Sequence, residues 1–365
     1  MDDRSQCQLN VVWEGPLCQA SSLATINREQ GWNLARSGVV QLVMIPPVDE
    51  HPTAVSPKLD TLAAYNVRHT EPTLIQAPVV WVRHQWPPQR ERPRGATWII
   101  MQPWEMSMLP TEFVDIFNQA DEVWTPSTFC RQVFVRSGVD PDKVQVIPNG
   151  IDPAVFTPAG EVPPLPTTKR FKFLYVGGTT YRKGFDVLLE AYVRAFTAAD
   201  DVCLVVKDCG TRTYYRGQTA EDLIAKVRAT PNTPEILYAD ADLSDEQMAQ
   251  LYRACDVLVA PYRGEGFCMP ALEAMACGLP VVVTVGGGTD DFVDETVGWL
   301  IPAEERALGQ NVDGREFPGT VSLLEPDVGV LVETLRYCYE HPQQCRDKGI
   351  AASLRARTEW TWHRS

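Results

Sequence analysis

The chain has 365 residues, a length typical of two or three domains. Its 44% hydrophobic and 22% charged residues indicate a globular protein and exclude a disordered one. The formal net charge of -14 argues against a nucleic-acid partner and against contact with an anionic membrane over a wide face. The sequence contains no apolar run near the roughly 18 residues that span a bilayer, and residues 1–6 lack the pattern of a signal peptide.

The ten cysteines are scattered and form no C-x-x-C pair, and several sit inside apolar runs such as residues 202–206. In a chain long enough to bury a large core, this pattern is typical of free thiols in a reducing compartment. The five histidines show no ligand spacing with the cysteines, which disfavours a zinc site. We therefore expect a cytoplasmic protein without an essential metal ion or cofactor.

Short runs rich in β-branched and aromatic residues alternate with amphipathic segments along the first half of the chain. These runs predict strands at residues 9–13, 39–45, 79–82, 98–101, 122–125 and 144–147. The segments 22–37 and 111–120 are predicted to be helices because their apolar residues recur with helical spacing.

The second half repeats this alternation, with strands predicted at residues 171–176, 202–207, 257–261 and 281–284. A helix is predicted to begin at Phe185, because a single apolar stripe follows the spacing i, i+3, i+4, i+7, i+11 through Leu188, Leu189, Tyr192 and Phe196. Strands that alternate with helices predict an α/β protein with parallel, doubly wound sheets covered on both faces.

A proline-rich stretch at residues 157–166 separates the two halves. Its four prolines cannot lie inside a sheet or a helix, so it is predicted to be a connector. We expect one Rossmann-like domain over residues 1–165 and a second over residues 166–365. Two such domains would face each other across a cleft, and open α/β sheets bind ligands beyond the carboxyl ends of their strands.

Residues 260–280 carry the clearest chemical signal. A strand ends in a glycine-bearing loop and a short helix follows, with Pro270 at its expected first position and Gly278 at its end. Cys268 and Met269 are poor helix caps, so the first amides of this helix are expected to bind an anion or sugar hydroxyls.

Two carboxylates in the same segment, Glu265 and Glu273, could face one ligand at separate points. Alternatively, Glu265 is a solvated loop charge and Glu273 interacts only with the helix dipole. The joint occurrence of the strand, the helix without a cap and the Glu-x7-Glu spacing favours the ligand-binding interpretation.

This segment resembles the signature of retaining, nucleotide-sugar-dependent glycosyltransferases of the GT-B fold, of the family-4 or group 1 type. Further stretches resemble the family in the same order along the chain. They are the domain-junction motif at residues 146–152, the phosphate-binding loop at residues 173–178 with Arg182-Lys183-Gly184, and the glycine-rich segment at residues 286–291.

The resemblance implies a role for each matching residue. Glu265 would contact the donor sugar, Glu273 would hold the ribose, and Lys183 would neutralise the diphosphate leaving group. Donor contacts are also implied for the amides of Gly266, Phe267, Cys268 and Met269 and for the loop residues Gly177 and Gly178. A fixed cation beside the leaving group stabilises the transition state more than the ground state, although Arg182 and Lys183 could equally be surface charges at a helix start.

The sequence departs from the family pattern at two places. Gly178 occupies the position of a usual arginine, for which Arg182 could substitute. The usual histidine after a strand of the first domain is absent, and Gln102 or Glu105 would take over its contact with the donor sugar. Gly15 follows the first strand where the family has a glycine loop beside the diphosphate.

Three other features have weaker signals. Residues 83–94 form a basic loop that could grip a phosphate-bearing acceptor or give peripheral contact with the inner membrane face, or whose arginines could simply pair with nearby carboxylates. His84 in this loop could be a catalytic base or a structural histidine. Asp240-Ala241-Asp242 resembles a metal-binding D-x-D motif, but Ser244 predicts a turn that enters a helix.

The sequence thus predicts a retaining glycosyltransferase of polysaccharide biosynthesis. The second domain would bind a nucleotide-sugar donor, and the first would bind a glycan or lipid-linked saccharide acceptor. Two alternatives remain open at this point: a nucleotide-sugar-binding protein without turnover, and a nucleotide-sugar epimerase of the same fold.

Overall fold

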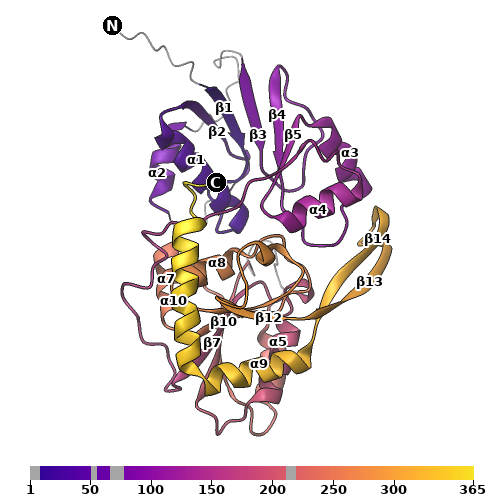
Figure 1. Cartoon of the computed structure of the whole chain (residues 1–365). Coiled ribbons are helices and arrows are strands. Elements are labelled where there is room, and N and C mark those ends of the chain that lie inside the picture. Colours follow the sequence, from indigo (N-terminus) through magenta and orange to yellow (C-terminus); the bar gives the residue numbers. More distant parts are fainter. Residues whose placement is uncertain (1–8, 51–55, 66–77, 211–218) are drawn as a thin grey trace. The chain divides into compact units, whose positions relative to one another are not determined.

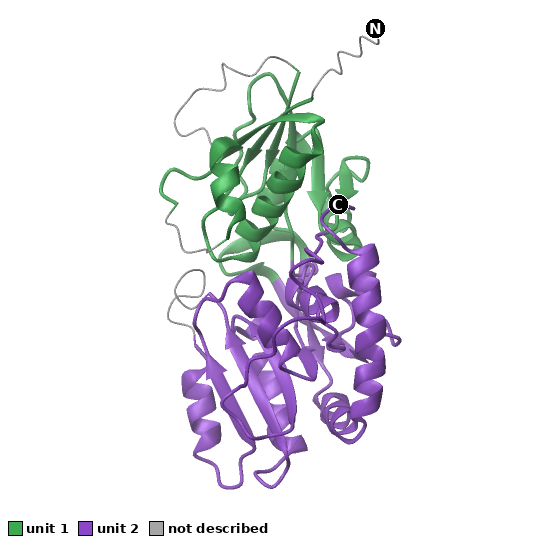
Figure 2. Cartoon of the chain, turned by 90° about the vertical axis from the view of Figure 1, so that its left-hand side faces the viewer, with its two compact units in different colours: residues 1–104, 108–148, 310–319 green, residues 105–107, 149–309, 320–365 purple. Residues whose placement is uncertain are grey.

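The computed structural model describes residues 9–50, 56–65, 78–210 and 219–365; the predicted absence of a signal peptide at residues 1–6 and the thiol of Cys7 lie outside these ranges. The chain forms two compact units, shown in Figure 2. Unit 1 comprises residues 1–104, 108–148 and 310–319, and unit 2 comprises residues 105–107, 149–309 and 320–365. The expected boundary at residue 165 therefore differs from this division, and the proline-rich stretch lies inside unit 2.

Unit 1 contains a six-stranded parallel sheet (Figure 1). In spatial order its strands are β2 (Val40–Ile45), β1 (Leu9–Glu14), β3 (Val79–Arg83), β4 (Ala96–Met101), β5 (Glu122–Thr125) and β6 (Val144–Val146). Its helices are α1 (Ser22–Ser37), α2 (Lys58–Leu62) with the 3-10 turn η1 (Ala63–Tyr65), α3 (Thr111–Gln119) and α4 (Thr128–Ser137). Strands are added in one direction from β1 to β2 and in the other from β3 onward, so the topological switch point lies between β1 and β3.

Unit 2 contains a second six-stranded parallel sheet. In spatial order its strands are β12 (Gly298–Ile301), β11 (Val281–Thr284), β10 (Val257–Ala260), β7 (Phe171–Gly177), β8 (Val202–Asp208) and β9 (Glu235–Ala239). Its helical elements are η3 (Tyr181–Lys183), α5 (Phe185–Ala195), α6 (Glu221–Arg228), α7 (Asp245–Arg253), α8 (Met269–Ala276), η4 (Gly288–Asp291), α9 (Val328–Glu340) and α10 (Pro342–Glu359). Here the switch point lies between β7 and β10.

The doubly wound α/β architecture and all ten predicted strands are confirmed, with ends that differ by at most two residues. Two strands of the unit 2 sheet were not predicted, β9 and β12, which form its two edges. The hairpin of β13 (Ala303–Val312) and β14 (Arg315–Pro326) was missed as well. Most of β13 is exposed, so its sequence lacks the apolar alternation that marks a half-buried strand.

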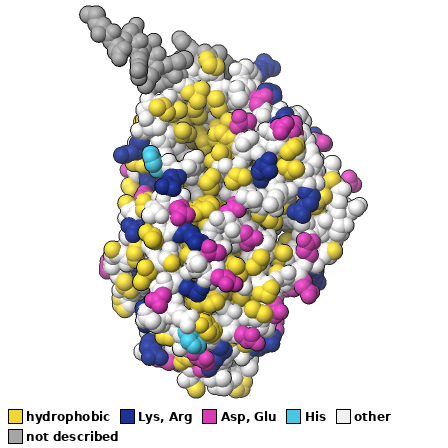
Figure 3. Space-filling model, in the orientation of Figure 1, with side chains coloured by type: hydrophobic (Ala, Val, Ile, Leu, Met, Phe, Trp, Pro, Cys, Tyr) yellow, Lys and Arg dark blue, Asp and Glu magenta, His cyan; other side chains and the backbone are white. Residues whose placement is uncertain are grey.

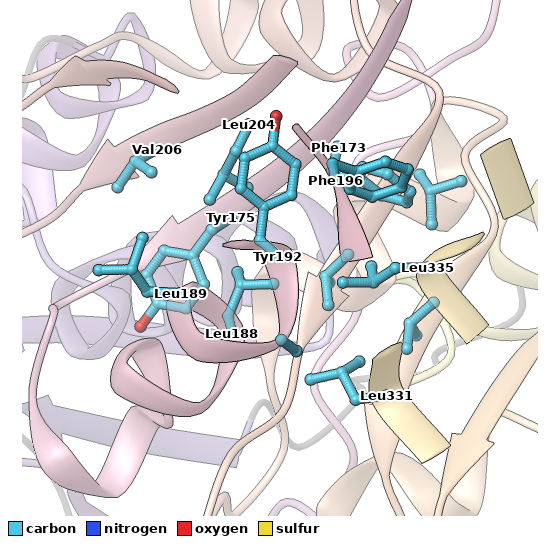
Figure 4. Packing of buried hydrophobic residues seen from close by; sticks show 14 of the residues in the cluster. Phe173, Tyr175, Leu188, Leu189, Tyr192, Phe196, Leu204, Val206, Leu331 and Leu335 are labelled. Carbon is cyan, nitrogen blue, oxygen red and sulfur yellow. The ribbon is translucent and has the colours of Figure 1, made fainter. Parts of the chain in front are cut away.

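One face of the sheet in unit 2 packs against α5 and α9 to form a large apolar core (Figure 4). Phe173 and Tyr175 of β7 and Leu204 of β8 point onto this face, and the predicted stripe of α5, including Leu188 and Tyr192, covers them. Every residue of β8 is buried, which shows that both faces of the sheet are covered. Within the described ranges, no helix is both long enough and apolar enough to cross a membrane.

A close backbone approach in unit 2 joins the loop after β7 to the loop after β10. The amide of Arg263 donates to the carbonyl of Arg182 at 2.7 Å. Gly184 follows η3 directly and has a φ of +70°. A Cβ at this position would lie 1.8 Å from the carbonyl oxygen of Pro261. Only glycine satisfies both conditions, so Gly184 lets η3 pack directly against the loop that follows β10.

We expect Gly184→Ala to lower the free energy of unfolding much more than Gly38→Ala. Gly38 has a nearly identical φ of +71°, but no atom lies within 4 Å of the position that a Cβ would take there. The control should therefore lose only the roughly 1–2 kcal/mol that a left-handed residue costs, whereas the clash should add about 1–3 kcal/mol at Gly184. Urea denaturation followed by circular dichroism measures both. Equal losses of unfolding free energy in the two variants would show that the loops do not depend on this close backbone approach.

Candidate active site

The carboxyl ends of β7 and β10 meet at the switch point of unit 2, the place where open α/β sheets bind ligands. The loop after β7, residues 178–184, and the loop after β10, residues 261–268, both lie at this edge. They bring together Glu265, Lys183 and Arg182, three of the residues that the sequence singled out.

A buried ion pair forms the centre of this cluster. Glu265 is 8% exposed, and its Oε2 accepts from the Lys183 ammonium at 2.5 Å and lies 3.5 Å from the Arg182 guanidinium. Burial acts to raise the pKa of Glu265, but the two cations outweigh it and hold the pKa below its ordinary value. Glu265 is therefore an ionised counter-ion of both cations and not a solvated loop charge.

Arg182 also contacts the backbone and a second carboxylate. Its guanidinium donates to the carbonyl of Gly264 at 2.7 Å and lies 3.4 Å from Glu105. Glu105 was expected to contact the donor sugar from the first domain; residues 105–107 group with unit 2, and the sugar contact itself stays a prediction. Gln102, the alternative candidate, lies in unit 1 and donates to the carbonyl of Gln85 at 2.5 Å.

Hydrogen bonds to strands β7 and β8 hold the loop after β7 in place. The Tyr175 hydroxyl donates to the carbonyl of Gly178 at 2.9 Å. The Thr179 hydroxyl donates to Asp208, which is fully buried at the carboxyl end of β8. The buried Thr180 hydroxyl has no hydrogen-bond partner among the described residues. This loop, with Gly177 and Gly178 at its start, presents a fixed polar backbone at the edge of the sheet.

Helix α8 begins without a side-chain cap, as predicted, and its preceding residue Cys268 has a φ of +69°. Pro270 is the second helical residue, where the first was expected. The amide of Cys268, for which a ligand contact is predicted, donates to the Glu265 carboxylate in this structure. Glu265 thus supplies the negative charge that the first turn of α8 favours.

The side chain of Phe267 is structural. It is buried and packs against the rings of Phe292 and Trp360, with ring centroids 5.2 and 6.1 Å away. The amides of Gly266, Phe267 and Met269 remain predicted ligand contacts.

Glu273 lies on α8, one turn beyond its start, and is partly buried. The Tyr252 hydroxyl, on α7, donates to its carboxylate at 2.7 Å. Burial raises the pKa of Glu273 to about 7, although the hydrogen bond from Tyr252 favours ionisation. The two glutamates of the Glu-x7-Glu pattern therefore differ in charge state: Glu265 is firmly ionised, and Glu273 titrates near neutral pH.

Two glycines fix the glycine-rich segment after β11 against the loop after β10. A Cβ on Gly287 would lie 2.7 Å from the ring of Tyr262, and one on Gly288 would lie 2.1 Å from the carbonyl oxygen of Gly266. The amide of Gly288 donates to the carbonyl of Glu265 at 2.8 Å. These backbone contacts hold the loop that carries Glu265.

Arg263 was not predicted from the sequence. It is 5% exposed, forms ion pairs with Asp186 and Glu325, and lies 3.7 Å above the ring of Tyr181. It therefore ties η3, the start of α5 and β14 to the loop after β10. A single arginine after a strand carries no distinctive sequence signal, because its two carboxylate partners are 77 and 62 residues away.

In unit 1, a polar cluster occupies the switch point between β1 and β3. Gly15 has no room for a side chain, because a Cβ would lie 2.1 Å from the carbonyl oxygen of His84. The Asn27 amide group donates to the carbonyls of Pro16 and His84, which identifies its Oδ1 as an acceptor. That oxygen accepts from Trp13 at 2.8 Å and lies 2.7 Å from Nδ1 of His84.

His84 is therefore a neutral imidazole that donates from Nδ1. It is 1% exposed, and burial lowers its pKa to about 3. Its Nε2 has no hydrogen-bond partner among the described residues, and the same holds for the side-chain nitrogen of the adjacent Gln85. The switch point of unit 1 thus holds one buried acceptor and one buried donor that have no partner among the described residues.

The weaker sequence features now have structural explanations. Two arginines of the basic loop pair with carboxylates, Arg83 with Glu14 at 2.8 Å and Arg92 with Asp121 at 2.5 Å. On the face shown in Figure 3, basic and acidic side chains are interspersed. Asp240–Asp242 precede α7, whose cap is Ser244, as predicted. Nine cysteines in the described ranges are free thiols, and within these ranges no three of His, Cys, Asp and Glu form a metal-binding group.

Two family models match the chain. The model described as "Glycosyl transferases group 1" matches residues 162–313, and the model described as "Glycosyltransferase Family 4" matches residues 53–155. The chain is 32% identical over 203 residues to a D-inositol 3-phosphate glycosyltransferase of Geodermatophilus obscurus, a match that covers 51% of this chain and 41% of that protein. A protein of the same name from Arthrobacter is 30% identical over 62% of this chain and 48% of its own length. The chain thus matches about half the length of these curated relatives.

Solved structures resemble the chain over nearly its full length. Sucrose-phosphate synthase from Thermosynechococcus elongatus superposes with a TM-score of 0.68 and 16% identity, covering 97% of this chain and 95% of the other. Anabaena HepE in complex with UDP-glucose gives a TM-score of 0.65 at 15% identity, covering 97% and 96%. The two family matches and this fold make the chain similar to the group 1 glycosyltransferases of the GT-B fold.

Proposed function

We propose that the protein transfers a sugar from a nucleotide diphosphate sugar to a hydroxyl of a glycan or lipid-linked saccharide, with retention of the anomeric configuration. The observation that carries this proposal is the buried cluster of Lys183, Arg182 and Glu265 beside the start of α8. Two cations and a helix N-terminus at a switch point form a site for a diphosphate.

In this proposal the two cations exchange one anionic partner for another. Without a ligand, Glu265 neutralises Lys183 and Arg182. When the donor binds, the diphosphate takes over part of their charge, and Glu265 is placed beside the sugar carbon that becomes positive as the bond to the phosphate breaks. Charges that are already fixed in the site need no reorganisation at the moment of reaction.

Retention is supported by the weakness of two candidate bases, Glu265 and His84, whereas Glu273, with a pKa of about 7, is assigned to the ribose in this proposal. Inversion needs a strong general base to activate the acceptor hydroxyl from the opposite face. The pKa of Glu265 lies below its ordinary value, and the pKa of His84 is about 3, so both are poor bases. We therefore propose that the acceptor oxygen bonds to the sugar carbon as the bond to the diphosphate breaks, and that the departing phosphate oxygen takes the acceptor's proton.

We further propose that unit 1 binds the acceptor. A sugar hydroxyl both donates and accepts hydrogen bonds, so it would satisfy the bare Nε2 of His84 and the bare amide nitrogen of Gln85 together. In the same proposal, the carboxylate of Glu273 accepts hydrogen bonds from the ribose of the donor. Transfer is proposed to need no metal ion, because Lys183 and Arg182 supply the positive charge at the leaving group.

We expect Lys183→Met and Glu265→Gln each to lower the release of nucleoside diphosphate from the preferred donor by about a hundredfold or more, because each removes a fixed charge that stabilises the transition state. Wild-type protein is assayed with UDP-, GDP-, ADP- and TDP-sugars, with and without saccharide acceptors. Glu190→Gln, an exposed glutamate paired only with Arg194, is the matched control.

Each alternative has its own outcome in this assay. A donor that shifts the thermal unfolding temperature but releases no diphosphate with any acceptor would favour a binding protein. Conversion of the sugar without release would favour an epimerase.

Nucleotide affinity should rise with pH because of Glu273. Its pKa is about 7 in the protein, and only the ionised carboxylate accepts hydrogen bonds from both ribose hydroxyls. Between pH 6 and pH 8 the ionised fraction rises by about tenfold, so calorimetry should show up to that gain in affinity. The phosphates titrate in the same range, and Glu273→Gln is the control that isolates their effect. An unchanged pH profile in this variant would contradict the ribose contact.

Treatment with EDTA should leave diphosphate release within about twofold of the untreated rate, because in this proposal the protein's own cations stabilise the leaving group. The assay uses the preferred donor and metal-free buffer. A loss of activity that Mg²⁺ or Mn²⁺ restores would overturn the metal-independent mechanism and leave the transferase proposal standing.

A further inference from the structure

Lys207 is a buried lysine near the end of β8 that none of the roles above uses. It is 4% exposed, and in the sheet it lies between Val176 of β7 and Ala239 of β9. Its ammonium donates to the carbonyl of Asp208 at 2.7 Å and lies 3.6 Å from the sulfur of Cys209. These contacts place the ammonium at the carboxyl edge of the sheet, the same edge as the cluster of Lys183 and Glu265.

Among the described residues, the Lys207 ammonium contacts a backbone carbonyl and a thiol and forms no ion pair with a carboxylate. The sequence of residues 211–218 contains neither Asp nor Glu. One backbone carbonyl and one thiol are weak compensation for a buried ammonium, which strongly favours an anionic or strongly accepting partner. A bound ligand that offers an oxygen would provide that partner.

Contacts around Cys209 connect Lys207 to the proposed donor site. The amide of Cys209 donates to the carbonyl of Gly177, at the start of the loop after β7. A Cβ on Gly177 would lie 3.9 Å from the Lys183 side chain, so this hydrogen bond places Cys209 near the residues that carry Lys183. Lys207 is therefore at the same edge as the phosphate and ribose contacts, one strand further from the switch point between β7 and β10.

We propose that Lys207 donates a hydrogen bond to the oxygen on C4 of a pyrimidine or on C6 of a purine in the donor's nucleobase, and thereby selects bases with a keto group at that position. This inference rests on the proposed function, which places the diphosphate at Lys183 and the ribose at Glu273. The diphosphate and the ribose are assigned to Lys183 and Glu273, so the base is the remaining part of the nucleotide that can reach the end of β8. An ammonium carries only donors, so it binds a keto oxygen and opposes an exocyclic amino group at the same ring position.

The two pairs UDP and CDP, and GDP and ADP, test this selection. UDP and CDP differ at C4 of the pyrimidine, where a keto oxygen is replaced by an amino group, and GDP and ADP differ in the same way at C6. Calorimetry measures the affinity of each nucleotide for the wild-type chain and for Lys207→Met, a substitution of similar length without charge. We expect the wild type to favour the keto member of its preferred pair, and Lys207→Met to weaken that member by about ten- to a hundredfold, as expected for a hydrogen bond from a charged donor.

Two other lysine variants serve as controls. Lys183→Met should weaken all nucleotides alike, because its target is the diphosphate that they share. Lys172→Met changes a lysine of the adjacent strand β7 at the opposite edge of the same sheet, where its ammonium contacts the carbonyl of Arg170, and should change no affinity. If Lys207→Met does not fold, Lys207→Gln retains a neutral donor and should keep part of the keto preference.

Several results would overturn the proposal. They are a wild-type preference for CDP or ADP, equal losses for keto and amino nucleotides in the Lys207 variant, and a keto preference that survives the substitution. Absence of binding by every nucleoside diphosphate would instead overturn the proposed function itself. Selective binding that disappears in Lys207→Met, with Lys172→Met unchanged, supports both.

Discussion

The buried ion pair between Lys183 and Glu265 is the constraint on which the rest of the site depends. A buried charge is costly unless it is paired, so the loop after β7 and the loop after β10 must meet closely enough for their charges to touch. Arg182 adds a second cation, and the amide of Cys268 adds a hydrogen bond to the same carboxylate. A carboxylate that balances two cations and the start of α8 occupies the place where a diphosphate is proposed to bind.

Glycines allow these loops to approach each other closely, because a side chain at the same positions would keep them apart. Gly184 brings η3 against Pro261, and Gly288 brings the segment after β11 against Gly266. Arg263 then connects the assembled loops to α5 and β14 through Asp186 and Glu325. The chemistry of the site therefore rests on backbone approaches and on one structural arginine as much as on the charged residues themselves.

Much of the fold could be predicted because its information is local. The apolar stripe of α5 and the alternation of strands and helices follow from side-chain periodicity, and Ser244 marks the start of α7. The Glu-x7-Glu spacing also located the site, since both glutamates lie within one loop and one short helix. The strands β9, β12 and β13 escaped prediction, because partly or largely exposed strands carry a weaker apolar pattern.

Other features depend on partners that are distant in the sequence. The sequence by itself determined the α/β class, the two parallel sheets and the segment that carries Glu265, because periodicity and turn chemistry act over a few residues. Only the tertiary structure decided that Glu105 belongs with Arg182, that Glu265 is the counter-ion of two cations, and that the buried Lys207 ammonium contacts a carbonyl and a thiol rather than a carboxylate of the described residues. Those properties are set by burial and by charges brought together from separate strands, which no local pattern records.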